Sequence, residues 1–309
     1  MGILVLHKAP GERSTACVSL VRRVLKGAKV GHAGTLDSPA EGILVILVGA
    51  STRLSECAMA LAKEYVTEVQ FGETTSTDDA AGDLLERRPW GTPEELTRRL
   101  DEKIPAFLGH RFQIPPVISA VHVDGQRAHD LARAGQDPGL SPRVVFVSSV
   151  QRRGPVTLDG RVTLCVRCHK GTYIRSIVRD LGRALGCGAH VVTLERRRCG
   201  PFSLAQALST EQVKNLGSAE LMERLLPDRH LAEAYPTYVP ASPEAEEALR
   251  HGRSIPLYLL RRHRWGDHCP PPLVVLLSRG MALGKRAFMD RRPWFVPHAL
   301  IGIDGEGIR

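Results

Sequence analysis

The run from Ile43 to Val48 holds six consecutive apolar residues and is bounded by Gly42 and Gly49. It has the length of a β-strand and shows no alternation of apolar and polar positions. This combination predicts a central strand that is buried on both faces. A chain with such a strand must place further layers on both sides of its sheet. The run is far too short to cross a bilayer, so we expect no membrane partner.

The segments around this run predict a mixture of strands and helices. Residues 64–71 alternate and are rich in β-branched and aromatic side chains. Strands are predicted at 3–7, 43–48, 64–71, 144–150, 156–168 (broken by a turn at Asp159-Gly160) and 191–194. Helices are predicted from Ser14, as the N-cap, to Gly27, at 51–61, from Thr92 and after Thr172. The interpretation is an α+β fold with a mixed, mainly antiparallel central sheet flanked by helices.

The composition changes near residues 235–240, which are predicted to form a linker. A short helix at 244–250 and a strand at 273–277 follow, among frequent Pro, Gly and Arg residues. The expected division is one domain at 1–235 and a small β-rich domain at 236–309.

The chain has 42 basic and 33 acidic residues, which gives a net charge of +9. Nucleic acid is the leading candidate partner because Lys and Arg neutralise phosphates. A basic surface that only maintains solubility is the alternative. Basic side chains gather at two places, the segment 22–29 and the run 196–198. The first residues do not resemble a secretory signal, so a cytoplasmic location is expected.

Seven cysteines at irregular spacing do not suggest a disulfide framework. Cys165 and Cys168 have the CxxC spacing of a metal site, but their surroundings predict a strand. Residues three apart in a strand point to opposite faces, so these two thiols are not expected to bind one ion. No second CxxC is present in the sequence. We therefore predict no metal site.

The stretch from Gly31 to Asp37 places one carboxylate in a Gly-rich turn just before the apolar run. Loops on a rigid scaffold often carry chemistry. An aspartate in a turn is, however, more often solvated or used as a cap. From these residues alone, both interpretations of Asp37 stay open.

Four separated segments together resemble the TruB family of tRNA pseudouridine synthases. The two most specific are Gly31-His32-Ala33-Gly34-Thr35-Leu36-Asp37 and Lys170-Gly171-Thr172-Tyr173-Ile174-Arg175. The others are Lys63-Glu64-Tyr65 and Gly186-Cys187-Gly188-Ala189-His190 with Leu194. Their order and spacing cover about residues 2–210. The C-terminal part resembles, more loosely, the PUA RNA-binding domain.

The resemblance implies that a uridine in the T loop of tRNA, U55, is flipped out and isomerised to pseudouridine without metal or organic cofactor. Asp37 would be the catalytic carboxylate, Arg175 its ionic partner, and Tyr65 would stack on the uracil. Further substrate-binding positions are Tyr173 and Leu194 as walls of the base pocket, His32 in the space left by the flipped base, and Lys8 at a phosphate. Ordinary packing or hydrogen bonding is the alternative at each position. The chain departs from the family pattern at Ser38-Pro39, directly after the aspartate.

The resemblance also implies a monomer that binds the tRNA T-stem loop without an obligatory protein partner. Two alternatives remain, a tRNA-folding chaperone with little catalysis and a catalytic subunit guided by RNA in a ribonucleoprotein. A glycoside hydrolase is a weaker alternative, because that chemistry usually pairs two carboxylates.

Overall fold

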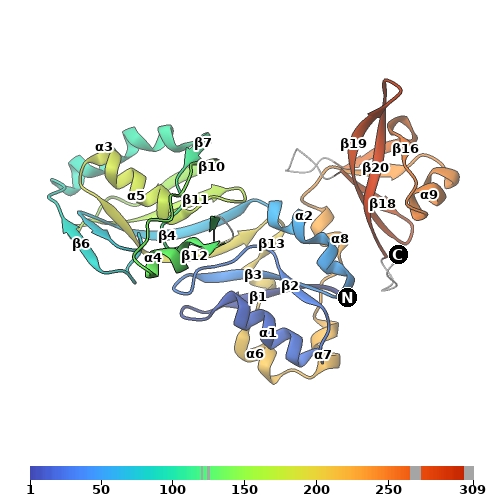
Figure 1. Cartoon of the computed structure of the whole chain (residues 1–309), viewed down its shortest axis with the longest axis horizontal. Coiled ribbons are helices and arrows are strands. Elements are labelled where there is room, and N and C mark those ends of the chain that lie inside the picture. The colour runs from blue at the N-terminus through green and yellow to red at the C-terminus, as the bar shows by residue number, and fades with distance from the viewer. Residues whose placement is uncertain (120, 124–125, 265–272, 303–309) are drawn as a thin grey trace. The chain divides into compact units, whose positions relative to one another are not determined.

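The computed structural model describes residues 1–119, 121–123, 126–264 and 273–302. The chain divides into two compact units (Figure 1). The first consists of Met1–Asp37, Gly42–Leu61 and Cys199–Arg309, and the second of Ser38–Glu41 and Ala62–Arg198. The predicted boundary after residue 235 lies inside the first unit, and the division into 1–235 and 236–309 stays a prediction. None of the described helices is long and apolar enough to cross a membrane.

One part of the first unit combines strands and helices from residues 2–60 with others from residues 202–232. They are β1 (Gly2–Lys8), α1 (Ser14–Val24), β2 (Val30–His32), β3 (Glu41–Val48), the 3-10 helix η1 (Gly49–Leu54), α2 (Ser55–Ala60), β13 (Phe202–Ser203), η3 (Leu204–Gln206), β14 (Leu208–Ser209), α6 (Thr210–Asn215), α7 (Ser218–Glu223) and α8 (Arg229–Ala232). β1 pairs antiparallel with β3 and parallel with β14, so this part of the sheet is mixed. β2 adds antiparallel to β3.

The run from Ile43 to Val48 forms most of β3, and the predicted burial on both faces is confirmed. Ile43, Val45 and Leu47 belong to one buried cluster, which also contains residues of α2. Leu44, Ile46 and Val48 belong to a second cluster, with apolar residues of α1 and α6. Each side chain of this size contributes about 1.5–3 kcal/mol when fully buried. β3 is therefore a rigid base for the loop that precedes it.

The second unit is built on a five-strand run of sheet in the order β12-β4-β11-β10-β7. Its elements are β4 (Lys63–Phe71), β5 (Glu73–Thr75), β6 (Leu84–Arg87), α3 (Pro93–Lys103), η2 (Ile104–Phe107), β7 (Gly109–Gln113), β8 (His122–Val123), β9 (Gln126–Arg127), α4 (Ala128–Arg133), β10 (Arg143–Arg153), β11 (Arg161–Cys168), α5 (Ile174–Leu185) and β12 (Ala189–Cys199). β10 and β11, β11 and β4, and β10 and β7 pair antiparallel.

Helix α5 forms as its apolar spacing predicts. Its large apolar side chains are all buried, namely Ile174, Ile177, Val178, Leu181 and Leu185. The helix ends at Gly186, whose left-handed φ of 79° suits glycine. α3 packs beside it (Figure 1), and Arg99 donates a hydrogen bond to the carbonyl of Leu185. The C-terminal end of α5 is thereby tied to α3.

The C-terminal part of the first unit has its own six-stranded sheet, in the order β16-β20-β19-β18-β15-β17. Its elements are β15 (Thr237–Pro240), α9 (Pro243–Arg250), β16 (Ile255–Pro256), η4 (Leu257–Leu259), β17 (Leu260–Arg264), β18 (Leu273–Leu277), β19 (Gly280–Met289) and β20 (Arg292–Ile301). Its core includes Leu249, Val275 and Phe295. The expected α+β class with a large mixed sheet and a β-rich C-terminal part is confirmed.

Three local predictions were wrong. Residues 235–240 are not a linker, because 237–240 form β15 and Tyr235 is buried, with its hydroxyl donating to the Cys57 carbonyl at 2.5 Å. The helix expected at 51–61 is split into η1 and α2. The strand expected from Val156 begins only at Arg161, after the Asp159-Gly160 turn.

Candidate active site

The loop that carries Asp37 is held by buried neighbours on its own unit. The Ala33 amide donates to the Val45 carbonyl of β3 at 2.9 Å, and both Ala33 and Leu36 are buried. Ser14 Oγ accepts from the Leu36 amide at 3.0 Å and donates to the Leu36 carbonyl at 2.9 Å. Asp37 itself is half-buried. The fold thus presents one partly accessible carboxylate on a fixed backbone.

Ser14 is not the N-cap of α1, as was predicted. The cap position is Arg13, no side chain caps the helix there, and Ser14 is the first helical residue. Its hydroxyl instead bonds to the backbone 22 residues further along the chain. The sequence pattern gave no sign of this long-range use, since a serine before an apolar helix normally predicts a cap.

Lys8 lies at the end of β1 and is completely buried. Its ammonium donates to the carbonyls of Ala9 at 3.0 Å and Glu12 at 2.9 Å. In this arrangement Lys8 orders the turn before α1. The expected phosphate contact of Lys8 stays a prediction.

His32, at the end of β2 and opposite Ile46 of β3, is half-buried.

Tyr65 and Leu194 lie on neighbouring strands of the second unit, β4 and β12. The two strands are tied by a hydrogen bond of 2.7 Å from the Thr67 hydroxyl to the Thr193 carbonyl. Tyr65 is 9 % exposed, and Leu194 is half-buried. The structure therefore brings these two predicted pocket residues onto adjacent strands.

Tyr173 and Arg175 lie at the start of α5. The Gln113 side chain accepts from the Tyr173 amide at 2.8 Å and donates to its carbonyl at 3.1 Å. Arg175 is 4 % exposed and donates to the carbonyls of Thr77 at 2.8 Å and Ile118 at 3.0 Å. These contacts hold the guanidinium in one orientation. The predicted ion pair of Arg175 with Asp37 joins residues of different units and stays a prediction.

Two aspartates that the sequence did not point to contact arginines of α5. Asp79 Oδ2 lies 3.7 Å from Arg175 Nε, and Asp78 Oδ2 lies 3.0 Å from Arg179 Nη1. The pKa of Asp78 is raised by burial, which outweighs the opposing effect of Arg179. No role was predicted for these residues from the sequence alone, because two adjacent aspartates match no spacing rule.

The segment with these aspartates is also bonded to β12. The Ala80 amide donates to the Val191 carbonyl at 2.8 Å, and the Val191 amide donates to the Asp78 carbonyl at 3.1 Å. Val191 lies three residues before Leu194 on the same strand. The loop consequently links the start of α5 to the strand that carries Leu194.

The predicted basic clusters differ in exposure. Arg22, Arg23, Lys26 and Lys29 are all exposed. In the run 196–198, however, Arg196 is only 1 % exposed, and Arg197 forms an ion pair with Glu195 at 2.7 Å.

The CxxC geometry follows the sequence prediction. Cys165 is half-buried and Cys168 is 1 % exposed, in keeping with opposite faces of β11. Burial raises the pKa of the Cys168 thiol to about 12. Among the described residues, no group of three or more His, Cys, Asp or Glu side chains is arranged to hold a metal ion. Cys269 lies outside these residues.

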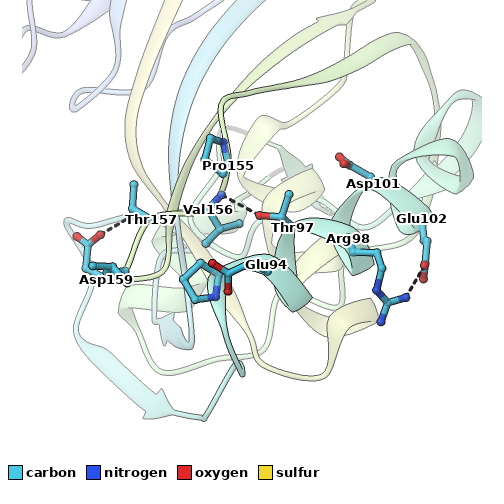
Figure 2. A pocket seen from close by; sticks show the side chains of 11 residues that line it. Glu94, Thr97, Arg98, Asp101, Glu102, Pro155, Val156, Thr157 and Asp159 are labelled. Carbon is cyan, nitrogen blue, oxygen red and sulfur yellow. Dashed lines mark hydrogen bonds and ion pairs between the residues drawn. The ribbon is translucent and has the colours of Figure 1, made fainter.

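An open hollow of about 1200 Å³ lies elsewhere on the second unit, between α3 and the turn that precedes β11 (Figure 2). Its lining includes Thr97, Asp101 and Leu158 but none of the seven predicted site residues. The Val156 amide donates to Thr97 Oγ1 at 3.0 Å across its floor. We assign no function to it.

Two solved structures share the fold of this chain. A Cbf5-Nop10-Gar1 complex superposes with a TM-score of 0.70 at 22% identity, over 98% of this chain and 86% of that chain. An H/ACA RNP bound to a substrate RNA containing 2'-deoxyuridine gives a TM-score of 0.65 at 20% identity, over 99% of this chain and 84% of that chain. At these identities the likeness defines the fold alone.

Sequence comparisons define the family. Residues 22–174 match the TruB family pseudouridylate synthase N-terminal domain, and residues 175–232 match the tRNA pseudouridylate synthase B C-terminal domain. A tRNA pseudouridine synthase B of Halalkalibacterium halodurans is 36% identical over 99% of both chains. Another of Stutzerimonas stutzeri is 41% identical over 73% of each chain. The chain therefore belongs to the TruB family of tRNA pseudouridine synthases and is an isomerase.

Proposed function

We propose that this enzyme binds the T-stem loop of tRNA, flips out uridine U55 and isomerises it to pseudouridine, with Asp37 as the catalytic carboxylate. The observation that supports this proposal most is the environment of Asp37 in this member of the TruB family. Its side chain is partly accessible, while Ala33 and Leu36 beside it are buried and hydrogen-bonded. A catalytic group needs this combination of access and fixed backbone.

The reaction breaks the bond between N1 of uracil and C1′ of ribose and forms a bond between C5 and C1′. The proton on C5 is released and N1 gains one, so the product is an isomer of the substrate. An ionised Asp37 would attack C1′ or stabilise its positive charge as the first bond breaks. A base in a folded loop must leave its stack before this step, which costs a few kcal/mol. No metal or organic cofactor is part of the proposal.

Residues of the second unit would form the pocket for the flipped uracil. Tyr65 would stack on the base and assist removal of the C5 proton, and Leu194 on the adjacent strand would form an apolar wall with Tyr173. Arg175 would pair with Asp37 and keep it ionised. The fixed orientation of the Arg175 guanidinium on two backbone carbonyls supports a positioning role for it. His32 would occupy the space that the base leaves in the RNA.

The segment 236–309 would act as a PUA-like RNA-binding domain. Support comes from the outer half of the hairpin β19–β20, where Lys285, Arg286, Arg291 and Arg292 are all exposed. Phe288 is 66 % exposed, and the Arg286 guanidinium lies 4.9 Å from its ring centroid. Exposed arginines beside an aromatic ring suit phosphates and bases. We further propose a cytoplasmic monomer that needs no obligatory protein partner.

The test measures tritium release from tRNA transcripts labelled at uridine C5. We expect the purified enzyme to release tritium unaided, and Asp37→Asn to abolish release while tRNA binding changes little. Asp83→Asn is the matched control, because Asp83 is exposed. Unchanged release by Asp37→Asn would refute the role of Asp37. Activity only with an added guide RNA would favour the ribonucleoprotein alternative.

The chaperone alternative needs a separate assay, since folding and modification of tRNA can coexist in one protein. Refolding of misfolded tRNA by the Asp37→Asn variant would reveal a chaperone role. A wild-type enzyme that forms no pseudouridine at U55 would refute the isomerase proposal, and refolding of tRNA by that enzyme would favour the chaperone alternative.

A further inference from the structure

We propose that Ser14 is a positioning residue for the reaction and that its hydroxyl fixes the backbone from which Asp37 projects. The inference rests on the proposed catalytic role of Asp37. Ser14 is 3 % exposed, and its Oγ forms both hydrogen bonds to Leu36, one with the amide and one with the carbonyl. A hydroxyl can donate one hydrogen bond and accept two, so Ser14 Oγ can form both of these bonds at the same time.

The two bonds act on the peptide groups on either side of Leu36. The Leu36 amide belongs to the peptide group shared with Thr35, and the Leu36 carbonyl belongs to the one shared with Asp37. Peptide groups are planar, so holding the carbonyl oxygen also holds the Asp37 nitrogen that lies in the same plane. The orientation of the Asp37 Cα–Cβ bond is limited accordingly. Ser14 therefore acts on the carboxylate without touching it.

The position of Ser14 is in turn set by hydrogen bonds of Lys8 and Glu12 in the turn after β1. Lys8 donates to the carbonyl of Glu12, and the Glu12 carboxylate accepts from the Ala9 amide at 3.0 Å. The second Glu12 oxygen accepts from the Thr210 hydroxyl at 2.7 Å. Thr210 is the first residue of α6, which follows β14 beside β1. These contacts anchor the turn that leads into Ser14 to two separate elements.

This arrangement explains one departure from sequence expectation. A serine at the start of a helix normally caps it, yet no side chain caps α1. The Ser14 hydroxyl is used instead on the backbone of Leu36, the residue before Asp37.

The test compares Ser14→Ala with Ser19→Ala, an exposed serine on the same helix. We expect Ser14→Ala to lower the single-turnover rate on saturating tRNA about 10- to 100-fold, the effect of a small misplacement of a catalytic group. The Kd for tRNA should stay within about twofold, because Ser14 does not reach the surface. Ser19→Ala should match the wild type in both. An unchanged rate for Ser14→Ala, or equal losses in rate and affinity, would overturn the inference.

Ser14→Cys guards against a simple failure to fold. A thiol keeps a donor and an acceptor at this position, although sulfur is larger than oxygen and forms weaker hydrogen bonds. The rate should therefore decrease in the order Ser14, Ser14→Cys, Ser14→Ala, and a folded Ser14→Cys with the full wild-type rate would refute the proposal. Asp37→Asn separates the two levels. If Asp37→Asn abolishes tritium release and Ser14→Ala does not slow it, only the positioning role of Ser14 is refuted. If Asp37→Asn stays active, the proposed catalytic role of Asp37 is refuted.

Discussion

At the scale of single residues, the second unit fixes Arg175 with more than one kind of contact. Two backbone carbonyls and the Asp79 carboxylate surround its guanidinium, and the Arg175 and Asp79 side chains are 5% and 10% exposed. A buried ion pair is a weak source of net stability, but removal of one charge leaves the other uncompensated. Asp79 is consequently expected to matter for both stability and catalysis.

We expect Asp79→Asn to lower the free energy of unfolding by about 1–3 kcal/mol, because Arg175 keeps its carbonyl acceptors but loses its counter-charge. Tritium release should fall at least about tenfold, since a guanidinium that shifts by a fraction of an ångström no longer orients its partner. Urea unfolding and single-turnover assays measure the two effects. Asp83→Asn, with its exposed carboxylate in the same segment, should change neither. An Asp79→Asn enzyme with wild-type rate and stability would contradict this account.

The raised pKa of Asp78 predicts how the stability of an Asp78 variant depends on pH. Burial raises its pKa, so the folded state binds the Asp78 proton more tightly than the unfolded state does. Ionisation of Asp78 therefore costs stability as the pH rises through the ordinary and then the raised pKa. Asn at position 78 carries no such cost. We expect Asp78→Asn to become more stable relative to the wild type as the pH rises from about 3 to neutral, as measured by urea unfolding.

Asp101 provides a control of opposite sign. A hydrogen bond from Arg152 lowers its pKa, so Asp101 contributes stability above its ordinary pKa and loses it as the pH falls. Asp101→Asn should thus become less stable relative to the wild type as the pH rises. The effect should be small, because the Asp101 side chain is 50% exposed. The same trend for Asp78→Asn and Asp101→Asn would show that burial of Asp78 is not the cause.

At the scale of elements, the local sequence pattern predicted the structure correctly where burial of apolar side chains decides it. The run Ile43–Val48 predicted a strand buried on both faces, and a helix was predicted after Thr172, where α5 forms with its large apolar side chains buried. Burial of apolar side chains decides both. Pattern failed at residues 235–240, where Pro and Tyr suggested a linker but pairing with β17 and β18 forms a strand. It also missed Asp78 and Asp79, whose partners are about 100 residues away in sequence.

Helix α5 closely contacts the segment that follows it, so a substitution there can show whether packing or helix propensity has the larger effect on stability. Gly182 lies inside α5, and a Cβ there would meet the Ala189 nitrogen at 2.3 Å and the Gly188 carbonyl carbon at 2.4 Å. Helix propensity alone predicts that Gly182→Ala gains about 1 kcal/mol. Overpacking against backbone costs about 1–3 kcal/mol or more, so we expect net destabilisation in thermal unfolding. Arg183→Ala, an exposed change on the same helix, should be nearly neutral; a stabilised Gly182→Ala would show that the segment yields easily.

At the scale of the whole molecule, the net charge of +9 does not say where RNA binds. Two Arg-Arg pairs differ in their surroundings. Arg87 and Arg88, on and just after β6, form ion pairs with Glu73 and Glu86. Arg291 and Arg292 lie at the tip of the β19–β20 hairpin, and Arg291 has a φ of 63°, which is unfavourable for a long side chain. Both hairpin side chains are exposed, so they are accessible to a phosphate.

We therefore expect reversal of both hairpin arginines to Glu to weaken tRNA binding more than reversal of Arg87 and Arg88, although both variants change the net charge by the same amount. If the tip contacts two phosphates, log Kd plotted against log salt concentration should lose about 1–2 from its slope, because fewer counterions are released on binding. Filter binding between about 50 and 200 mM salt measures this slope. Equal losses in the two variants would mean that affinity follows total charge. The chemical step at saturating tRNA should be unaffected in the hairpin variant, since the change is directed at binding and leaves Asp37 and its supports intact.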